Sequence, residues 1–395
     1  MSDPKIVIIG AGSAGITTAA HLLNARSDLD VMIIDPSDKH YYQPLWTLVG
    51  AGVFPKEESE RQQEDYIPQG ANWKRDAVES IEPDNNSIKT VGGETITYDY
   101  LVVCPGLQLN WSEIKGLSKS IVGTHGVCSN YSYDTVESTW ELIRNFQGGT
   151  ALFTHPETPV KCGGAPQKIC YLAENQFRKL GIRDQCEVIF AVAKPRIFPV
   201  DPYASSLEKM VKRRGIDVKL QHNLKEVRPE TREAILEQMD TGAEVTIQYD
   251  MLHVTPKMGA CDFVKQSPLA GDDGWVDVDK HTTQHVKFSN VFSLGDSSNL
   301  PTSKTGAAIR KQAPTTAQNI LCLIDGKRLE GHYDGYTSCP LVTSYNGMIL
   351  AEFDYDKQPQ ESFPFDQSKE RFSMYILKKF GLPKLYWHGM LRGRV

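Results

Sequence analysis

The sequence predicts an α/β fold in two units of parallel strands and helices, followed by an amphipathic C-terminal segment. Three observations support this prediction. A buried strand, a glycine-rich turn and a helix open the chain over residues 6–23, strands and helices alternate again over residues 150–220, and basic and aromatic residues gather over residues 366–395. The 395 residues are enough for about two or three domains.

The composition indicates a globular protein and excludes several classes of partner. Apolar residues make up 40% of the chain and the net charge is −6, which gives a nucleic-acid partner no electrostatic support. No run of about 18 apolar residues predicts a membrane-spanning helix, and we expect no signal peptide at the N-terminus. The eight cysteines include no C-x-x-C pair, so we expect no metal site and no secreted disulfide framework.

The first glycine turn is typical of a dinucleotide-binding, Rossmann-like domain. Gly10, Gly12 and Gly15 match G-x-G-x-x-G directly after the apolar run at residues 6–9. The first glycine permits a tight turn, the second lets the backbone approach a pyrophosphate, and the third lets the helix pack closely on the sheet. Asp35 ends the second predicted strand, where a carboxylate can accept a hydrogen bond from a ribose hydroxyl.

Two later strands indicate that the dinucleotide is FAD and that its domain is discontinuous. Residues 97–106 are predicted to form an apolar strand that ends in a glycine turn, and residues 290–300 another that ends in a Gly-Asp turn at Asp296. This order of motifs resembles the glutathione-reductase-like flavoproteins, in which the Gly-Asp turn places a carboxylate on the ribityl chain of the flavin. We therefore expect an FAD-binding domain formed by residues 1–115 and 285–335.

The second unit, residues 116–284, has the strand and helix order of a Rossmann-like domain without its fingerprint. The turn after the predicted strand at 150–154 carries three prolines and a glycine pair but no spaced G-x-G-x-x-G. The predicted strand at 186–192 is not followed by an acidic residue. An NADH site would need both features. We therefore expect a degenerate NADH site, with Cys162 in the space that NADH would use.

Long sequence strings give a more specific identification. They are YYQPLWTLVGAG (41–52), TPVKCGGAPQKI (158–169), LPTSKTGAA (300–308) and YDGYTSCPLVT (333–343). On these strings the chain resembles the sulfide:quinone oxidoreductases, in the class that includes the animal mitochondrial enzymes, over essentially its whole length. The resemblance implies an FAD enzyme that oxidises sulfide to sulfane sulfur and passes two electrons to a membrane quinone.

The resemblance also implies roles for individual residues. Cys162 and Cys339 would form a redox-active disulfide at the flavin, a pairing that their distance in the chain cannot support alone. Sulfide would attack Cys339 to give a persulfide, and sulfite, glutathione or another thiol would take the sulfane sulfur. The FAD contacts would be Gly10, Gly12, Ser13, Ala14, Gly15, Asp35, Gln43, Val78, Asp296, Lys304, Thr305, Gly306 and Ala307.

Three further residues have open roles. Cys128 stands where other classes of the family carry a third cysteine. It is a candidate auxiliary thiol or covalent flavin tether, and the alternative is an inert loop cysteine. Lys161 and Lys168 flank Cys162 and are expected either to lower the pKa of its thiol or to be simply solvated.

The C-terminal region, residues 336–395, is expected to bind quinone and a membrane surface. Residues 366–395 are short, basic, aromatic-rich and amphipathic, as in helices that lie in a membrane interface, with a predicted helix break at 381–383. The candidate contacts are Tyr345, Phe353, Phe372, Ile376, Phe380 and Trp387. We expect a peripheral (monotopic) protein of a bacterial or mitochondrial inner membrane; docking of the segment on the protein's own core, or a contact in a homo-oligomer, is the alternative.

Two other functions compete with this interpretation. A type II NADH:quinone oxidoreductase would share the fold and the acceptor, but it needs an intact second glycine fingerprint and no cysteine pair. A non-catalytic flavin or sulfur carrier would bind FAD and reduce no quinone.

Overall fold

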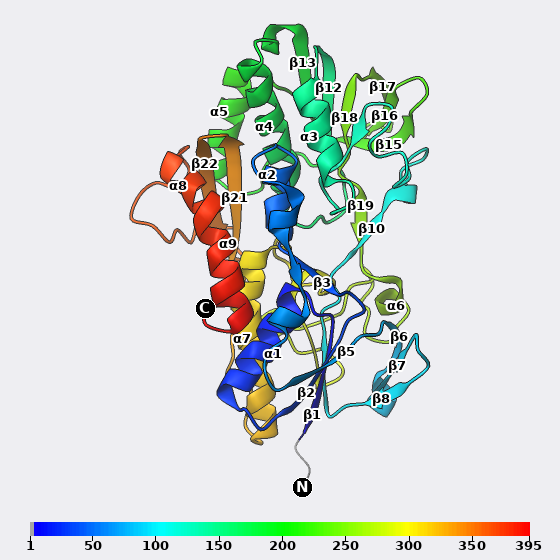
Figure 1. Cartoon of the computed structure of the whole chain (residues 1–395), viewed down its shortest axis with the longest axis vertical. Helices are drawn as coiled ribbons and strands as arrows, with labels where there is room; N and C mark the ends of the chain where they lie inside the picture. Colours follow the sequence, from blue (N-terminus) through cyan, green and yellow to red (C-terminus); the bar gives the residue numbers. More distant parts are fainter. Residues whose placement is uncertain (1–3) are drawn as a thin grey trace.

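The computed structural model describes residues 4–395 and arranges them in two α/β units stacked along the long axis of the molecule (Figure 1). The first unit contains a five-stranded parallel sheet in the order β20-β9-β1-β2-β5. Its strands are β1 (Lys5–Ile9), β2 (Asp30–Ile34), β5 (Ala71–Lys74), β9 (Tyr100–Val103) and β20 (Val291–Ser293). Because β20 follows the whole second unit in the chain, the first unit is discontinuous, as predicted. The extreme N-terminus, on which we expect no signal peptide, lies outside the described residues.

The turn between β1 and α1 (Ser13–Ala25) depends on its glycines because three backbone segments approach closely there. Gly10 has a φ of +99°, and a Cβ on it would lie 2.5 Å from the carbonyl oxygen of Cys104, just past β9. A Cβ on Gly15 would lie 1.9 Å from the carbonyl oxygen of Gly10. A Cβ on Gly12 would meet no atom within 4 Å. The turn therefore holds α1 against the sheet while open space remains at its N-terminus.

The second unit contains another five-stranded parallel sheet, in the order β11-β18-β12-β13-β14. Its strands are β11 (Val127–Cys128), β12 (Gly149–His155), β13 (Cys186–Val192), β14 (Asp217–Leu220) and β18 (Met251–His253). Helices α3 (Val136–Asn145), α4 (Ala165–Lys179) and α5 (Tyr203–Arg214) lie on one side of it, and a small antiparallel sheet lies on the other (Figure 1). That sheet is formed by β15 (His222–Arg228), β16 (Glu233–Gln238) and β17 (Glu244–Gln248).

Successive side chains of β12 point alternately toward the helices and toward the small antiparallel sheet. Phe153 is fully buried in the cluster that includes the residues of α4, and Leu152 is fully buried in the cluster that includes the small antiparallel sheet. Helix α4 begins at Ala165, and Pro166 fits its first turn, where the missing N–H of proline leaves no bond unmade. This start places Lys168 in the first turns of the helix.

The chain passes between the units on two short strands. β10 (Gln108–Asn110) leaves the first unit and pairs antiparallel with β19 (Lys257–Gly259), which returns to it. Val264 and Trp275 are then buried in the same cluster as Val7 of β1. The chain therefore rejoins the first unit soon after β19, earlier than the predicted boundary at residue 284, because the segment after β19 covers an apolar face of the first sheet.

The C-terminal region combines a hairpin with one long helical segment. The hairpin consists of β21 (Thr337–Ser344) and β22 (Gly347–Phe353), and α7 (Gly306–Ile324) precedes it. The segment runs through α8 (Phe372–Ile376), η8 (Leu377–Gly381), α9 (Leu382–Lys384), η9 (Leu385–Gly389) and η10 (Met390–Arg392). The predicted break at 381–383 was wrong, because wider π-helical turns before and after α9 accommodate the ring of Pro383. No helix within residues 4–395 combines the length and apolar character of a membrane-spanning segment.

Candidate active site

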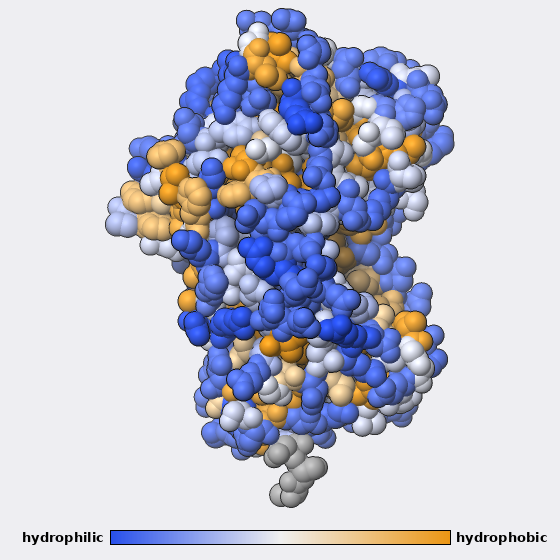
Figure 2. All heavy atoms as spheres, in the orientation of Figure 1, coloured by the Kyte–Doolittle hydropathy of each residue, from blue (hydrophilic) through white to orange (hydrophobic). Residues whose placement is uncertain are grey.

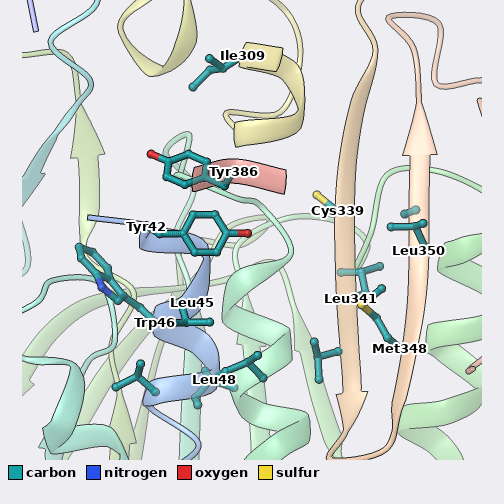
Figure 3. Close-up of a cluster of buried hydrophobic side chains, with 14 of the residues drawn as sticks. Tyr42, Leu45, Trp46, Leu48, Ile309, Cys339, Leu341, Met348, Leu350 and Tyr386 are labelled. Carbon is teal, nitrogen blue, oxygen red and sulfur yellow. The ribbon is translucent and has the colours of Figure 1, made fainter. Parts of the chain in front are cut away.

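Cys162 and Cys339 meet where the β12–α4 loop packs on β21. The thiol of Cys339 donates a hydrogen bond to the sulfur of Cys162. The glycine pair that follows Cys162 permits this approach, since a Cβ on Gly164 would lie 2.5 Å from a side-chain carbon of Leu341 on β21. Figure 3 shows the Cys339 side chain pointing away from β22, toward the side on which Tyr42 and Tyr386 lie. The two sulfurs that are remote in the chain are therefore neighbours in the fold.

The backbone of Cys162 ties the loop to the first unit. Cys162 has a φ of +58°, in the left-handed region that non-glycine residues enter at some cost in free energy. In this conformation its N–H donates to the carbonyl oxygen of Lys304 at 2.8 Å, and its carbonyl oxygen accepts from the N–H of Ala165 at 2.7 Å. The loop thus spans from the turn before α7 to the start of α4.

The two thiols have opposite electrostatic surroundings. The hydrogen bond from Cys339 and the ammonium of Lys168 hold the pKa of the Cys162 thiol well below its usual range. The Nζ atom of Lys168 donates to the Cys162 sulfur at 3.1 Å, and Lys168 is only 4% exposed. The hydrogen bond to Cys162 and burial raise the pKa of Cys339 well above its usual range. The pair is therefore a thiolate at Cys162 beside a neutral thiol at Cys339.

Two further lysines approach the cysteine pair. Lys378 of η8 is 2% exposed and donates to the carbonyl oxygen of Pro44 at 2.9 Å. Burial, together with the charge of Lys168, lowers the pKa of Lys378 to about 7, against the opposing charge of Cys162. Lys161 donates to the side-chain oxygen of Gln43 at 2.7 Å, and burial lowers its pKa to about 8. Lys378 therefore adds a second positive charge near the Cys162 sulfur, whereas the ammonium of Lys161 acts on Asp296.

The Gly-Asp turn after β20 lies next to this cluster. Burial raises the pKa of the Asp296 carboxyl, while the charges of Lys304 and Lys161 oppose that rise. The Nζ atom of Lys304 donates to the backbone carbonyl of Asp296 at 2.7 Å and lies 3.7 Å from the ring centroid of Trp275. Thr305 then caps α7 by accepting from the N–H of Ala308 at 3.1 Å. The carboxylate, the start of α7 and the cysteine loop thus converge.

Comparison with known proteins identifies the family. Residues 4–319 match the family described as pyridine nucleotide-disulphide oxidoreductase. The chain is 50% identical to the mitochondrial sulfide:quinone oxidoreductase of Dictyostelium discoideum over 393 residues, which cover 99% of this chain and 86% of the relative. The chain belongs to the sulfide:quinone oxidoreductase family. It is also 48% identical to the Mus musculus mitochondrial enzyme over 390 residues, which cover 98% of this chain and 86% of that one.

A solved structure supports the fold of this sulfide:quinone oxidoreductase family member. The sulfide:quinone oxidoreductase of Aquifex aeolicus superimposes with a TM-score of 0.82 at 21% identity, covering 99% of this chain and 92% of that one. Sulfide:quinone oxidoreductases are FAD-dependent flavoproteins.

The first unit of the family member fits FAD. Open space lies in front of Gly12, where a pyrophosphate would face the N-terminus of α1. The carboxylate of Asp35 accepts from the N–H groups of Ala11 at 2.7 Å and Ser37 at 2.8 Å, and its oxygens keep further lone pairs for ribose hydroxyls. Asp296 supplies a second carboxylate at the end of β20. The expected cofactor is therefore matched by a phosphate cradle and by two acidic turns, one after β2 and one after β20.

The other expected FAD contacts occupy varied positions. A Cβ on Gly295 would lie 3.3 Å from the Cβ of Ala14, so the two glycine turns lie side by side. The hydroxyl of Ser13 is hydrogen-bonded to the Tyr386 hydroxyl at 2.7 Å. Gln43 is exposed and holds Lys161. Val78 is buried at the start of β6 (Val78–Glu82), and Gly306 and Ala307 form the first turn of α7.

Cys128 lies in a different environment from the cysteine pair. It is fully buried at the end of β11, near the hydroxyl of Thr139 on α3. Burial raises the pKa of Cys128 to about 12. Because thiolates and not thiols carry cysteine reactivity, this environment favours the inert role among the three that we considered.

The C-terminal candidates divide into an exposed and a buried set. Phe372, Ile376 and Phe380 are 61%, 37% and 50% exposed. Apolar surface is visible over α8 and the loop before it at the left of Figure 2. Trp387 and Phe353 are each 5% exposed, so they offer almost no surface to a membrane, and their contact with quinone stays a prediction.

The buried C-terminal residues instead hold the segment on the protein. Trp387 packs on Tyr66, with ring centroids 4.8 Å apart, and lies under the guanidinium of Arg61. Phe353 packs edge-on against Phe198. Tyr345 is half-buried and donates its hydroxyl to the carbonyl oxygen of Ala51 at 2.8 Å. One side of the segment thus docks on the core, which is the alternative that the sequence left open.

Sequence reasoning missed Lys378 and Tyr386 as members of the site. Tyr386 bridges Ser13 and His40, whose Nε2 lies 2.6 Å from the tyrosine hydroxyl. Lys378 follows the buried Met374 and Tyr375 at helical spacing, so it is a charged residue on the inward face. That break in an apolar stripe was the available signal.

Proposed function

We propose that this chain is a sulfide:quinone oxidoreductase in which Cys162 and Cys339 form the sulfide-oxidising disulfide. The observation that carries the proposal is the asymmetric thiol pair, with Lys168 held at 3.1 Å from the Cys162 sulfur. In the oxidised form the two sulfurs would be bonded to each other. A disulfide is an electrophile that hydrosulfide can open.

The asymmetry assigns the first step. Hydrosulfide attacks the sulfur of Cys339, the Cys339–Cys162 bond breaks, and the electron pair leaves on Cys162 as a thiolate. Cys162 is the better leaving group because the ammonium of Lys168 stabilises its anion, and a lower thiol pKa favours departure. Cys339 is 1% exposed, so the burial of the attacked sulfur favours a nucleophile as small as hydrosulfide over a bulky thiol.

The second step removes the sulfane sulfur. A small nucleophile such as sulfite, glutathione or another thiol attacks the outer sulfur of the Cys339 persulfide and expels Cys339 as a thiolate. The two thiolates then lose two electrons and re-form the disulfide. FAD supplies the chemistry that accepts this electron pair and passes it to a quinone. The lysines near Cys162 stabilise the negative charge that develops on sulfur in each step.

The C-terminal segment is the proposed site of contact with the membrane and its quinone. Phe372, Ile376 and Phe380 present an exposed apolar edge, and Lys379 and Lys384 lie on the same segment. Such an edge lies in the interfacial plane of a bilayer rather than across it. We place the protein peripherally on the mitochondrial inner membrane, since the relatives are named as mitochondrial.

One anaerobic experiment tests the proposed function. Flavin absorbance is recorded during addition of sulfide or of NADH, and a short-chain quinone is added afterwards. We expect bleaching by sulfide, none by NADH and recovery with quinone. Prompt bleaching by NADH without any by sulfide would instead assign the chain to the NADH:quinone oxidoreductases. Bleaching by sulfide without recovery would indicate a sulfur carrier.

A second experiment tests the membrane contact. The double variant Phe372→Ser, Phe380→Ser should bind FAD normally, and sulfide should still reduce that FAD. The variant should lose co-sedimentation with anionic liposomes, because each aromatic ring that is buried in the bilayer contributes about 2 kcal/mol to the free energy of membrane binding. Phe353→Leu is the matched control, since Phe353 is buried in the protein and should leave liposome binding unchanged. Unaltered sedimentation of the double variant would place the contact elsewhere.

A further inference from the structure

The carboxyl edge of the second sheet holds two polar groups that the mechanism above does not use. Tyr131 follows β11 and Thr255 follows β18, and these strands are neighbours in the sheet, with Cys128 opposite His253. The Cys162 loop follows β12, the next strand in the order. In an open parallel sheet, ligands bind at this edge. The three residues therefore converge from adjacent strands on the place where chemistry is expected.

Both hydroxyls are buried without a hydrogen-bond partner. Tyr131 is 3% exposed and Thr255 is 1% exposed, and neither side-chain oxygen has a partner among the described residues. The Thr255 hydroxyl is close to that of Tyr131 without completing a hydrogen bond with it. An unpaired buried hydroxyl lowers the free energy of unfolding by about 1–3 kcal/mol. Two such hydroxyls side by side, those of Tyr131 and Thr255, therefore call for an explanation.

Tyr131 also lies against Cys162. Tyr131, Val160, Ala165 and Met258 form one buried cluster, and Cys162 packs on it. The Tyr131 hydroxyl is near enough to the Cys162 sulfur for a thiolate there to raise the pKa of Tyr131, in addition to the larger effect of burial. The phenol therefore stays protonated and remains a hydrogen-bond donor while Cys162 carries a negative charge.

The reaction removes one of the donors that Cys162 has in the structure. With both cysteines reduced, the Cys162 sulfur accepts from Lys168 and from the Cys339 thiol. Once Cys339 carries the sulfane sulfur, its own sulfur bears no hydrogen, and the proton that hydrosulfide brought leaves the outer sulfur when the acidic persulfide ionises. Lys168 is then the donor that remains on the Cys162 sulfur. We propose that Tyr131, oriented by Thr255, then donates to the Cys162 thiolate in place of Cys339. Tyr131 is a positioning residue in this scheme, which rests on the proposed function.

A variant that lacks the Cys339 donor isolates this effect. In Cys339→Ala, Cys162 resembles the persulfide state in having no thiol donor from β21. The reaction of Cys162 with methyl methanethiosulfonate, followed against pH by peptide mass spectrometry of the holoprotein, reports its thiolate fraction. The other groups that act on this titration stay in place in every variant; they are Lys168 of α4, Lys378 of η8 and Asp296 after β20.

Adding Tyr131→Phe to Cys339→Ala should raise the pH inflection of Cys162 by about one unit and slow its reaction about tenfold below that pH. The same substitution with Cys339 present should move the inflection by less than half as much. Adding Thr255→Val should give a smaller rise that Thr255→Ser restores. Tyr249→Phe is the matched control, because Tyr249 is 2% exposed with an unpartnered hydroxyl in another cluster.

An unchanged inflection with Tyr131→Phe, or the same change with Tyr249→Phe, would overturn the inference. An equal shift with and without Cys339 would overturn the exchange of donors. Flavin content and thermal unfolding of each variant establish that it is folded. None of these measurements requires turnover, so failure of the inference is separate from failure of sulfide to bleach the flavin.

Discussion

The two parallel sheets have the same architecture but opposite chemistry at their carboxyl edges. The first edge presents a glycine turn and two carboxylates, Asp35 and Asp296, which suit the phosphates and hydroxyls of a dinucleotide. The second presents Cys162, Lys168 and two unpartnered hydroxyls. The comparison teaches that the fold supplies a position, while the loop after β12 decides whether that position binds a nucleotide or holds a reactive sulfur.

Substitution of the cysteines should have the largest effect, and it should impair the second edge while leaving the first intact. Cys162→Ser and Cys339→Ser should each retain FAD but lose at least about a thousandfold in the rate of flavin reduction by sulfide, because covalent catalysis is abolished. Cys261→Ser is the control, since Cys261 lies beyond β19, where it is partly buried against the core of the first unit. Stopped-flow absorbance measures the rates. A near-normal rate in either serine variant would remove that thiol from the mechanism.

A substitution in the first glycine turn should have the opposite effect and impair the first edge. Gly15→Ala would place a Cβ 1.9 Å from the carbonyl oxygen of Gly10 and force α1 away from the sheet. We expect the purified variant to contain little or no flavin, as measured by its visible absorbance. Gly271→Ala should keep its flavin, because a Cβ there would meet its nearest neighbours at 3.4 Å or more, which is ordinary van der Waals contact. Full flavin content in Gly15→Ala would contradict the role of this turn.

A smaller effect should follow from removing the positive charge at the second edge. Lys168→Met should raise the pKa of Cys162 and make it a poorer leaving group, so sulfide should reduce the flavin about 10- to 100-fold more slowly at neutral pH. The reduced protein should then show its thiolate only at higher pH. Lys179→Met, at the far end of α4, is the control. An unshifted pH profile would mean that Lys168 does not stabilise the thiolate.

The smallest effect should come from the cap that joins the two edges. Thr305 accepts from the N–H of Ala308 and is hydrogen-bonded to Thr337 at 2.8 Å. Thr305→Ala should lower the free energy of unfolding by about 1 kcal/mol, measured by denaturant titration of the holoprotein. Thr305→Ser keeps both bonds and should restore most of the loss. Equal stability of the alanine variant would show that the cap is not needed.

Local patterns predicted the first edge well and the second edge only in part. The glycine turn and Asp35 lie in one continuous strand–turn–helix–strand unit, so their spacing determines their arrangement. Cys339 reaches Cys162 only because β21 packs on α4, and no local pattern encodes that contact. The pairing could be predicted from family resemblance and not from residue spacing.

The C-terminal segment shows the same limit. Its apolar residues were recognised, but which of them face solvent depends on the docking of Tyr386 and Trp387 on the first unit. Pro383 predicted a break that π-helical turns remove. Lys378 enters the site from a segment whose sequence resembles a surface helix, and only the packing places it near Cys162.

The location of the sulfane sulfur distinguishes the two cysteines most directly. Oxidised holoprotein is mixed anaerobically with one equivalent of sulfide, trapped with an alkylating reagent and analysed by peptide mass spectrometry. We expect one added sulfur atom on the peptide that contains Cys339 and an alkylated Cys162. An added sulfur on Cys162 alone would reverse the assigned roles, and a pair that is neither bridged before sulfide nor modified after it would contradict the central claim.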